Sequence, residues 1–172
     1  MAFVDDIAFF EGGERNVKVI RRIVLGLFLL LVLSILAPIP VNNIIAGHLE
    51  RQLRDCPLPP DTRLVDSASI AGRLYGNGNG MQWHGYLLVE SDLSIAELAA
   101  WYNERIAAGE DDIISVERQE TPYIVDAYHL SHQFKRFSGA ENSYQVYLGR
   151  NSAVGSERSL WERFLNFDLR GH

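Results

Sequence analysis

The sequence predicts an α+β protein in which one N-terminal transmembrane helix precedes a mostly antiparallel sheet with one main helix packed on it. Three observations indicate this class. Residues 23–41 carry no charge, two segments of alternating hydrophobicity flank an Asn-Gly turn, and a capping box opens an amphipathic helical pattern. Alternation with period two is typical of strands, whereas apolar residues at i, i+3 and i+4 indicate a helix.

The first element is a transmembrane helix over residues 23–41, with the sequence IVLGLFLLLVLSILAPIPV. As a helix these nineteen residues span about 28 Å, close to the hydrocarbon thickness of a bilayer. A cleavable signal peptide and a buried helix of a soluble protein are the alternatives. The run is longer than the usual apolar core of a signal peptide, and Arg21 and Arg22 precede it in the way that basic residues precede membrane spans. We therefore expect a retained anchor in the lipid bilayer.

Basic residues are distributed unequally about this span, which predicts its orientation. Two follow it closely, Arg51 and Arg54, and four precede it: Arg15, Lys18, Arg21 and Arg22. Because the more basic flank stays in the cytoplasm, residues 1–22 are expected to form a cytoplasmic tail. The remainder is then extracytoplasmic, and the protein is a single-pass protein of the cell membrane.

An amphipathic stalk and a proline linker are predicted for residues 42–60. One helical face of this segment is apolar, at Ile44, Ile45, Leu49 and Leu53. Three prolines end the helix and stiffen the chain, at Pro57, Pro59 and Pro60. The stalk could pack on its own domain or on lipid, or pair with a partner helix.

Residues 61–172 are enough for one hydrophobic core and too few for two domains. From Leu49 onward the chain has 18 acidic and 12 basic residues, a net charge of −6. This balance argues against nucleic acid and against anionic lipid as partners, and leaves a protein partner, a cationic ligand or simple solubility. Cys56 is the single cysteine, which rules out an internal disulfide.

The first predicted hairpin joins strands at residues 62–74 and 82–90 through an Asn-Gly turn. In the second strand, Trp83, Leu87 and Val89 lie on one side. His84 alternates with Trp83, so we expect it on the polar side. Asn and Gly tolerate the positive φ angles of such a turn, which explains their use here.

The best helix follows this hairpin. Ser94-Ile95-Ala96-Glu97 forms a capping box, in which the serine and glutamate side chains bind backbone N–H groups of the first turn. Apolar residues then repeat at helical spacing, at Ile95, Leu98, Ala99, Tyr102 and Ile106. Gly109 is expected to stop the helix, and Trp101, which lies off the apolar stripe, is expected to be exposed.

The remaining elements are predicted less simply. Residues 113–119 read as a strand, and residues 128–137 and 143–150 as a second hairpin about Ser138-Gly139. A helix across residues 124–134 is the alternative for part of that region. One helical turn at 159–163 and a last strand through Leu165, Phe167 and Leu169 complete the chain.

A glycine-rich loop is the candidate ligand site. It comprises Gly76, Asn77, Gly78, Asn79 and Gly80, with Trp83 and His84 following. Met81 stands where a GxGxxG motif needs its third glycine, and a strand rather than a helix follows, so no helix N-terminus faces a phosphate. A hairpin turn is the favoured interpretation, and a ligand-lining loop the alternative.

Other chemistry-bearing residues carry no specific pattern. His129 and His132 are three apart, but neither HExxH nor a third ligand accompanies them, so we expect no metal site and no cofactor. The acidic run at residues 110–112 resembles a solvated loop, and no GxSxG nucleophile elbow is present. Four aromatic residues could line a sugar or peptide site but more commonly pack in cores: Trp83, Tyr86, Trp101 and Tyr102.

Part of the outer domain resembles known sequences. The resemblance covers residues 67–85, SASIAGRLYGNGNGMQWHG, together with Ser91-Asp92-Leu93-Ser94 and Glu97-Leu98. They look like a group of uncharacterised bacterial membrane-anchored or lipoprotein-like domains with a GNGNGMQ-type motif. The closing segment at residues 168–172 is similar too. The resemblance implies a bacterial surface protein and transfers no catalytic residue.

These observations lead us to expect an outer domain that is a non-enzymatic binding or accessory module. It would contact the bilayer through residues 23–41 and a protein partner through the stalk or the domain. An enzyme acting on cell-envelope material and a structural subunit of a membrane complex are the alternative functions.

Overall fold

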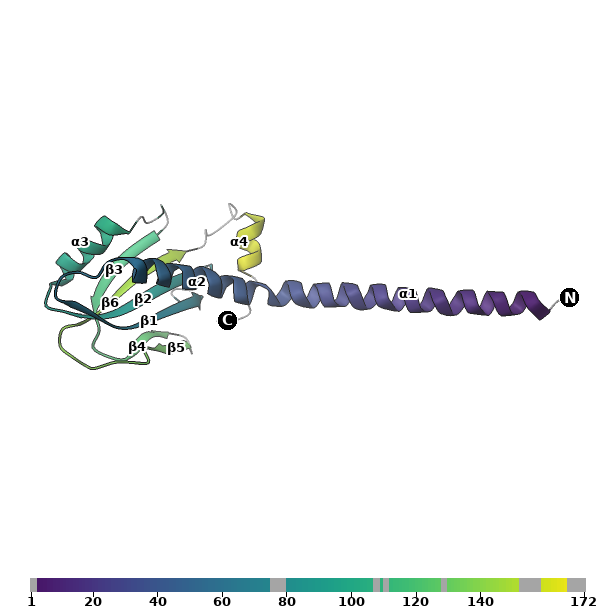
Figure 1. Ribbon diagram of the computed structural model, residues 1–172, viewed down its shortest axis with the longest axis horizontal. Coiled ribbons are helices and arrows are strands. Elements are labelled where there is room, and N and C mark those ends of the chain that lie inside the picture. Colours follow the sequence, from purple (N-terminus) through teal and green to yellow (C-terminus); the bar gives the residue numbers. More distant parts are fainter. Residues whose placement is uncertain are drawn as a thin grey trace. The chain divides into compact units, whose positions relative to one another are not determined.

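A computed structural model of the chain describes residues 3–74, 80–106, 109, 112–127, 130–151 and 159–166. The chain divides into two compact units, Met1–Ala37 and Pro38–His172. The elements of both units are labelled in Figure 1. In chain order they are α1 (Phe3–Leu36), α2 (Pro38–Asp55), β1 (Thr62–Gly72), β2 (Gln82–Ser91), α3 (Ile95–Arg105), β3 (Asp112–Arg118), β4 (Tyr123–Ala127), β5 (Leu130–Gln133), β6 (Ser143–Asn151) and α4 (Leu160–Leu165).

The first unit contains the apolar helix. Within the described residues one helical segment, Val17–Asp55, is long and apolar enough to cross a membrane, and its most apolar stretch is only 6% buried. A core helix of a soluble protein would be covered by the rest of the chain, so this exposure is consistent with a membrane anchor. α1 ends at Leu36, and Pro38 begins a new helix because proline has no N–H to continue the old one. The last four residues of the predicted span thus form the first turn of α2.

The second unit is built on an antiparallel sheet of four strands in the order β1-β2-β6-β3. β1 and β2 form the predicted hairpin, which pairs Thr62 with Ser91 at one end and Gly72 with Gln82 at the other. β6 lies between β2 and β3 and is antiparallel to both. With α3 packed on the sheet, the predicted α+β class is confirmed.

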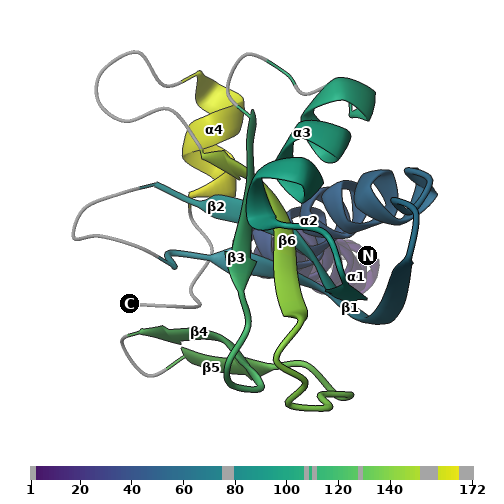
Figure 2. The ribbon, with the colours of Figure 1, turned by 90° about the vertical axis from the view of Figure 1, so that its left-hand side faces the viewer.

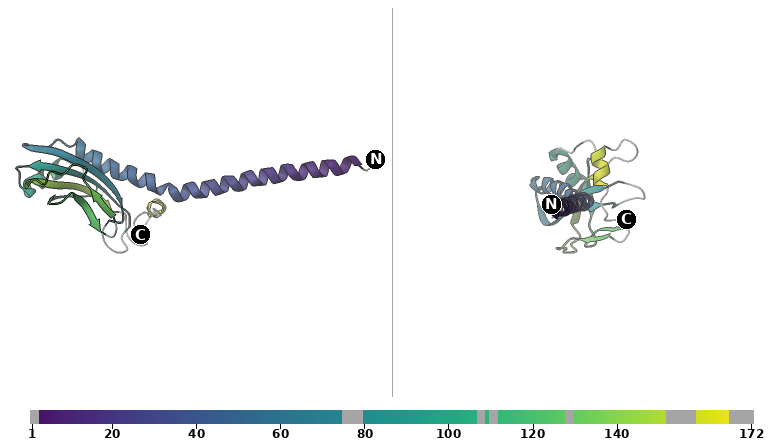
Figure 3. Two further views of the ribbon diagram at one scale, coloured as in Figure 1. Left: turned by 90° about the horizontal axis from the view of Figure 1, so that it is seen from below. Right: turned by 90° about the vertical axis from the view of Figure 1, so that its right-hand side faces the viewer.

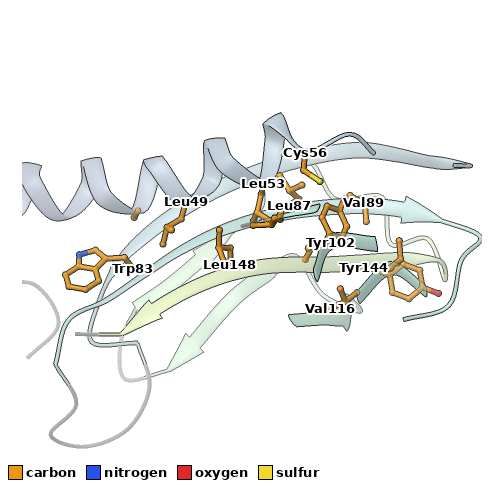
Figure 4. Packing of buried hydrophobic residues seen from close by; sticks show 14 of the residues in the cluster. Leu49, Leu53, Cys56, Trp83, Leu87, Val89, Tyr102, Val116, Tyr144 and Leu148 are labelled. Atoms are coloured by element: carbon orange, nitrogen blue, oxygen red, sulfur yellow. The ribbon is translucent and has the colours of Figure 1, made fainter. Parts of the chain in front are cut away.

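Three helices, α2, α3 and α4, cover one face of the sheet (Figure 2). α2 runs alongside the curved strands (Figure 3, left). Its Leu49 and Leu53 are fully buried and point toward Leu87 and Leu148 of the sheet (Figure 4). The segment expected to form a stalk is therefore part of the folded unit, in agreement with packing on its own domain.

Gly85 allows the close approach of α2 to β2. A Cβ atom at this position would lie 2.2 Å from the backbone nitrogen of Glu50 and 2.5 Å from the carbonyl carbon of Leu49. No side chain fits at such distances, so only glycine lets the helix backbone rest on the strand.

The helix α3 begins as predicted. The Ser94 side chain accepts a hydrogen bond from the Glu97 N–H, and the Glu97 carboxylate accepts one from the Ser94 N–H. Leu98 and Tyr102 are fully buried against the sheet. The helix ends at Arg105 with Ile106 as its C-cap, so it stops before Gly109, which was expected to end it.

A second, smaller cluster covers part of the opposite face of the sheet. Its members come from β1 and the residues just after it, from β2 and from the β4–β5 region: Ile70, Leu74, Tyr86, Leu88, Ile124 and Phe134. Both faces of β2 are consequently buried, which explains why nearly every residue of this strand is covered.

The second predicted hairpin is wrong, and so is its helical alternative. β5 pairs with β4, and β6 pairs with β2 and β3, so residues 128–137 and 143–150 do not form a hairpin with each other. A helix across residues 124–134 is excluded by the same pairing. Alternation predicts a strand but carries no information about its partner. Leu165 ends α4 instead of beginning a strand, and Phe167 and Leu169 lie outside the described residues.

Candidate functional site

The predicted ligand loop is only partly described. Gly76, Asn77, Gly78 and Asn79 lie outside the described residues, whereas Gly80 is buried. The ligand role of this loop therefore stays a prediction. Its two neighbours on β2, Trp83 and His84, are described, and their side chains lie on opposite faces of the sheet.

Trp83 makes a structural contact with the first turns of α2. Its indole is 3% exposed, and the Nε1–H donates to Oδ1 of Asn42 at 2.9 Å. The Asn42 amide nitrogen in turn donates to the carbonyl oxygen of Leu165 at 3.0 Å. A buried amide thus ties the sheet, α2 and α4 together, and each of these polar groups is paired, as burial requires.

His84 is buried, so the expectation that it faces a polar side is wrong. It is 5% exposed, its Nδ1 shares a 2.7 Å hydrogen bond with the Tyr86 hydroxyl, and its ring stacks on Tyr147. Burial lowers the pKa of His84 to about 4, which keeps the ring neutral at physiological pH. Alternation along β2 directs the side chain toward the second cluster, and the ring is buried because that face of the sheet is covered as well.

The four aromatic candidates do not form one site. Trp83 and Tyr102 belong to the cluster under the helices, and Tyr86 to the cluster on the other face. Trp101 is half-buried: its Nε1–H donates to the Pro57 carbonyl, and the Arg105 guanidinium lies 3.5 Å from the ring centroid. The expectation of an exposed Trp101 is therefore met only in part.

The predicted histidine and acidic candidates are also separated. His132 is exposed on β5, and His129 lies outside the described residues, as do Glu110 and Asp111. Asp112 accepts hydrogen bonds from Arg150 at 2.6 and 2.8 Å, and these bonds lower the pKa of its carboxyl group. Among the described residues no cluster of three His, Cys, Asp or Glu side chains could hold a metal ion.

A more promising feature is the outer edge of β1, which sequence reasoning did not identify. The Ser91 N–H donates to the Asn142 carbonyl, so odd-numbered residues of β2 bond toward β6. Successive residues of an antiparallel strand bond to opposite neighbours, and the even-numbered residues of β2 therefore bond to β1. Their partners are Asp66, Ala68 and Ile70. Ser67, Ser69 and Ala71 consequently direct their backbone N–H and C=O groups away from the sheet.

A groove accompanies this edge. It has a volume of about 410 Å³ and is lined by residues 67–70 of β1, by Glu50 of α2 and by residues of the β4–β5 side, among them His132 and Lys135. No strand pairs with the outer side of β1 in the part of the chain that the structure describes. An unpaired edge beside a groove can accept an extended segment of another chain.

One end of the edge is closed. A bulge interrupts the β1–β2 ladder between Leu64 and Asp66, and the Asp66 carboxylate accepts hydrogen bonds from the backbone N–H groups of Ser67, Lys135 and Arg136. Bulges and charged side chains are common means of protecting an edge from aggregation. The open part of the edge is therefore short and begins beyond Ser67.

A second cavity of about 470 Å³ lies between the C-terminal ends of α2 and α3. Arg51, Arg105 and Cys56 are among its lining residues. Burial raises the pKa of the Cys56 thiol, against the opposing effect of the Arg105 charge, so the reactive thiolate is disfavoured. The groove at β1 is thus the better candidate site.

Comparisons of the chain with protein-family models, with curated proteins and with solved structures find no match.

Proposed function

We propose that this chain is a single-pass membrane protein whose outer domain is a non-enzymatic binding module for an extended peptide segment of a partner protein. The groove along the open edge of β1 carries this proposal. Ser69 and Ala71 offer backbone donors and acceptors there, and main-chain pairing supplies affinity in this mode of recognition.

The charges beside the groove define the partner. Glu50 lies on the α2 side and accepts a hydrogen bond from Ser67, whereas Lys135 lies on the β4–β5 side. Successive side chains of an added strand point to opposite faces. The peptide that fits therefore carries a basic residue toward Glu50 next to an acidic residue toward Lys135.

Selection from a library of random linear peptides tests this proposal, with the full chain held in lipid nanodiscs. We expect enrichment of extended sequences with adjacent basic and acidic residues. Ser69→Pro removes one outward N–H without touching the β1–β2 ladder, and proline is tolerated at such edge positions. Binding of the selected peptides should be lost in Ser69→Pro and retained in Ser69→Ala. Equal binding to both variants would place the site elsewhere, and a failure to enrich any peptide would contradict the binding-module proposal.

The orientation of the chain is part of the same proposal. The excess of basic residues before the span supports a cytoplasmic N-terminus and an extracytoplasmic domain. Protease added to intact cells should remove an epitope placed at the C-terminus. Survival of that epitope until the cells are lysed would reverse the orientation.

A further inference from the structure

The short helix α4 exposes an unusual amount of apolar surface. Leu160 is 84% exposed and Trp161 57% exposed, and the Trp161 ring stacks on Phe164 with centroids 5.4 Å apart. Arg163 is exposed on the same helix. Two adjacent large apolar side chains beside a basic one are typical of a surface that contacts another phase or molecule.

The contacts that attach α4 to the domain place it close to the start of α2. The helix is attached by Leu165, which is 2% exposed and whose carbonyl accepts the hydrogen bond from Asn42. Asn42 is the first polar residue after the uncharged run of residues 23–41. Within α2, it lies four residues after Pro38, the first residue of the helix, a rise of about 6 Å. Chain connectivity therefore holds α4 near the point where the chain leaves the span.

We propose that α4 contacts the membrane surface, with Leu160 and Trp161 inserted among the phospholipid headgroups and Arg163 near the phosphates. Tryptophan favours this layer because its ring is apolar and its N–H is polar. The contact would add a second attachment beside the span and hold the domain against the bilayer. This inference rests on the membrane anchor of the proposed function.

Quenching by brominated lipid tests the contact, because bromine quenches only tryptophan rings that lie close to it. The full chain is reconstituted in phosphatidylcholine vesicles whose acyl chains carry bromine near the headgroup end. Trp161→Phe should abolish most of the quenching of tryptophan emission. Trp101→Phe is the matched control, because Trp101 lies on α3 and its indole N–H donates to the Pro57 carbonyl. This variant should be quenched like the wild type. Trp83 is present in both variants, so its emission contributes equally to the two measurements.

Flotation of the same vesicles separates failure of the contact from failure of the anchor. If the protein floats with the vesicles and Trp161→Phe is quenched as strongly as the wild type, the α4 contact is wrong and the anchor stands. If the protein does not float, the anchor is wrong and the α4 contact falls with it. Flotation together with loss of quenching in Trp161→Phe alone supports the contact.

Discussion

Gly85→Ala should destabilise the domain severely, because the new methyl group would collide with backbone atoms of α2. The ideal Cβ position is 2.2 Å from the Glu50 nitrogen, 2.5 Å from the Leu49 carbonyl carbon and 2.6 Å from the Glu50 Cα. Carbon atoms pack at about 3.5–4.0 Å, so α2 or β2 has to retreat by roughly 1–2 Å. No side-chain rotation relieves the clash, since all three atoms belong to the backbone.

The loss of stability follows from the contacts that are loosened when α2 and β2 move apart. Leu49 and Leu53 are both 0% exposed and pack between α2 and the sheet. Overpacking usually costs about 1–3 kcal/mol, and a rigid backbone obstacle places Gly85→Ala at about 3 kcal/mol or above. Domains are stable by about 5–15 kcal/mol, so the melting temperature should fall by roughly 10 °C.

Thermal unfolding of the full chain in detergent micelles, followed by tryptophan emission, measures this effect. Gly47→Ala is the matched control, because its Cβ would meet only the Ser69 Oγ at 4.0 Å. Alanine stabilises a helix interior by about 1 kcal/mol relative to glycine, so this control should melt at or above the wild-type temperature. If Gly85→Ala melts like the wild type, α2 does not rest on β2 as described.

Three further predictions concern the packing and the buried polar groups. Leu98→Ala should lower the free energy of unfolding by about 2–5 kcal/mol in chemical denaturation, because Leu98 is 0% exposed. Trp101→Ala, at a half-buried position, should lower it by less. The reverse order would contradict the packing of α3. The pKa of His84 is lowered to about 4 from an ordinary 6.5, so the unfolded chain binds the extra proton first and stability should fall as the pH drops from about 6.5 toward 4. His84→Gln should flatten that dependence in pH-resolved melts, and an unaltered slope would show that another group is responsible. Asn42→Ala removes the acceptor of the buried Trp83 indole N–H and should lower the free energy of unfolding by about 1–3 kcal/mol. Asn43→Ala, at an exposed position, should change it by no more than about 0.5 kcal/mol. Equal melting temperatures for the two variants would mean that the buried amide does not tie the elements together.

Features with local causes were predicted well from the sequence. The pairing of β1 with β2 was predicted from the alternation of hydrophobicity on both sides of the Asn-Gly sequence. The start of α3 follows from Ser94 and Glu97, whose side chains act within one helical turn. The apolar helix follows from the absence of charge over residues 23–41. In each case the deciding interactions join residues near one another in the chain or lie between the chain and its solvent.

The candidate site shows the limit of local reasoning. His84 alternates with Trp83, and alternation correctly places the two rings on opposite faces. It cannot say that both faces are covered, because the cover on the second face comes from Ile124 and Phe134, far along the chain. The open edge of β1 was not predicted for a related reason: a strand becomes an edge only when the order of the whole sheet is known.

The sequence by itself therefore determined the apolar helix, the first hairpin, the capped helix and the α+β class. The tertiary structure alone decided that β6 enters between β2 and β3, that Gly85 brings α2 onto the sheet, and that Asn42 joins Trp83 to Leu165. The physical reason is that hydrophobic periodicity encodes which face of an element is buried, whereas the identity of the partner depends on shape and hydrogen bonding between segments that meet only in the folded chain.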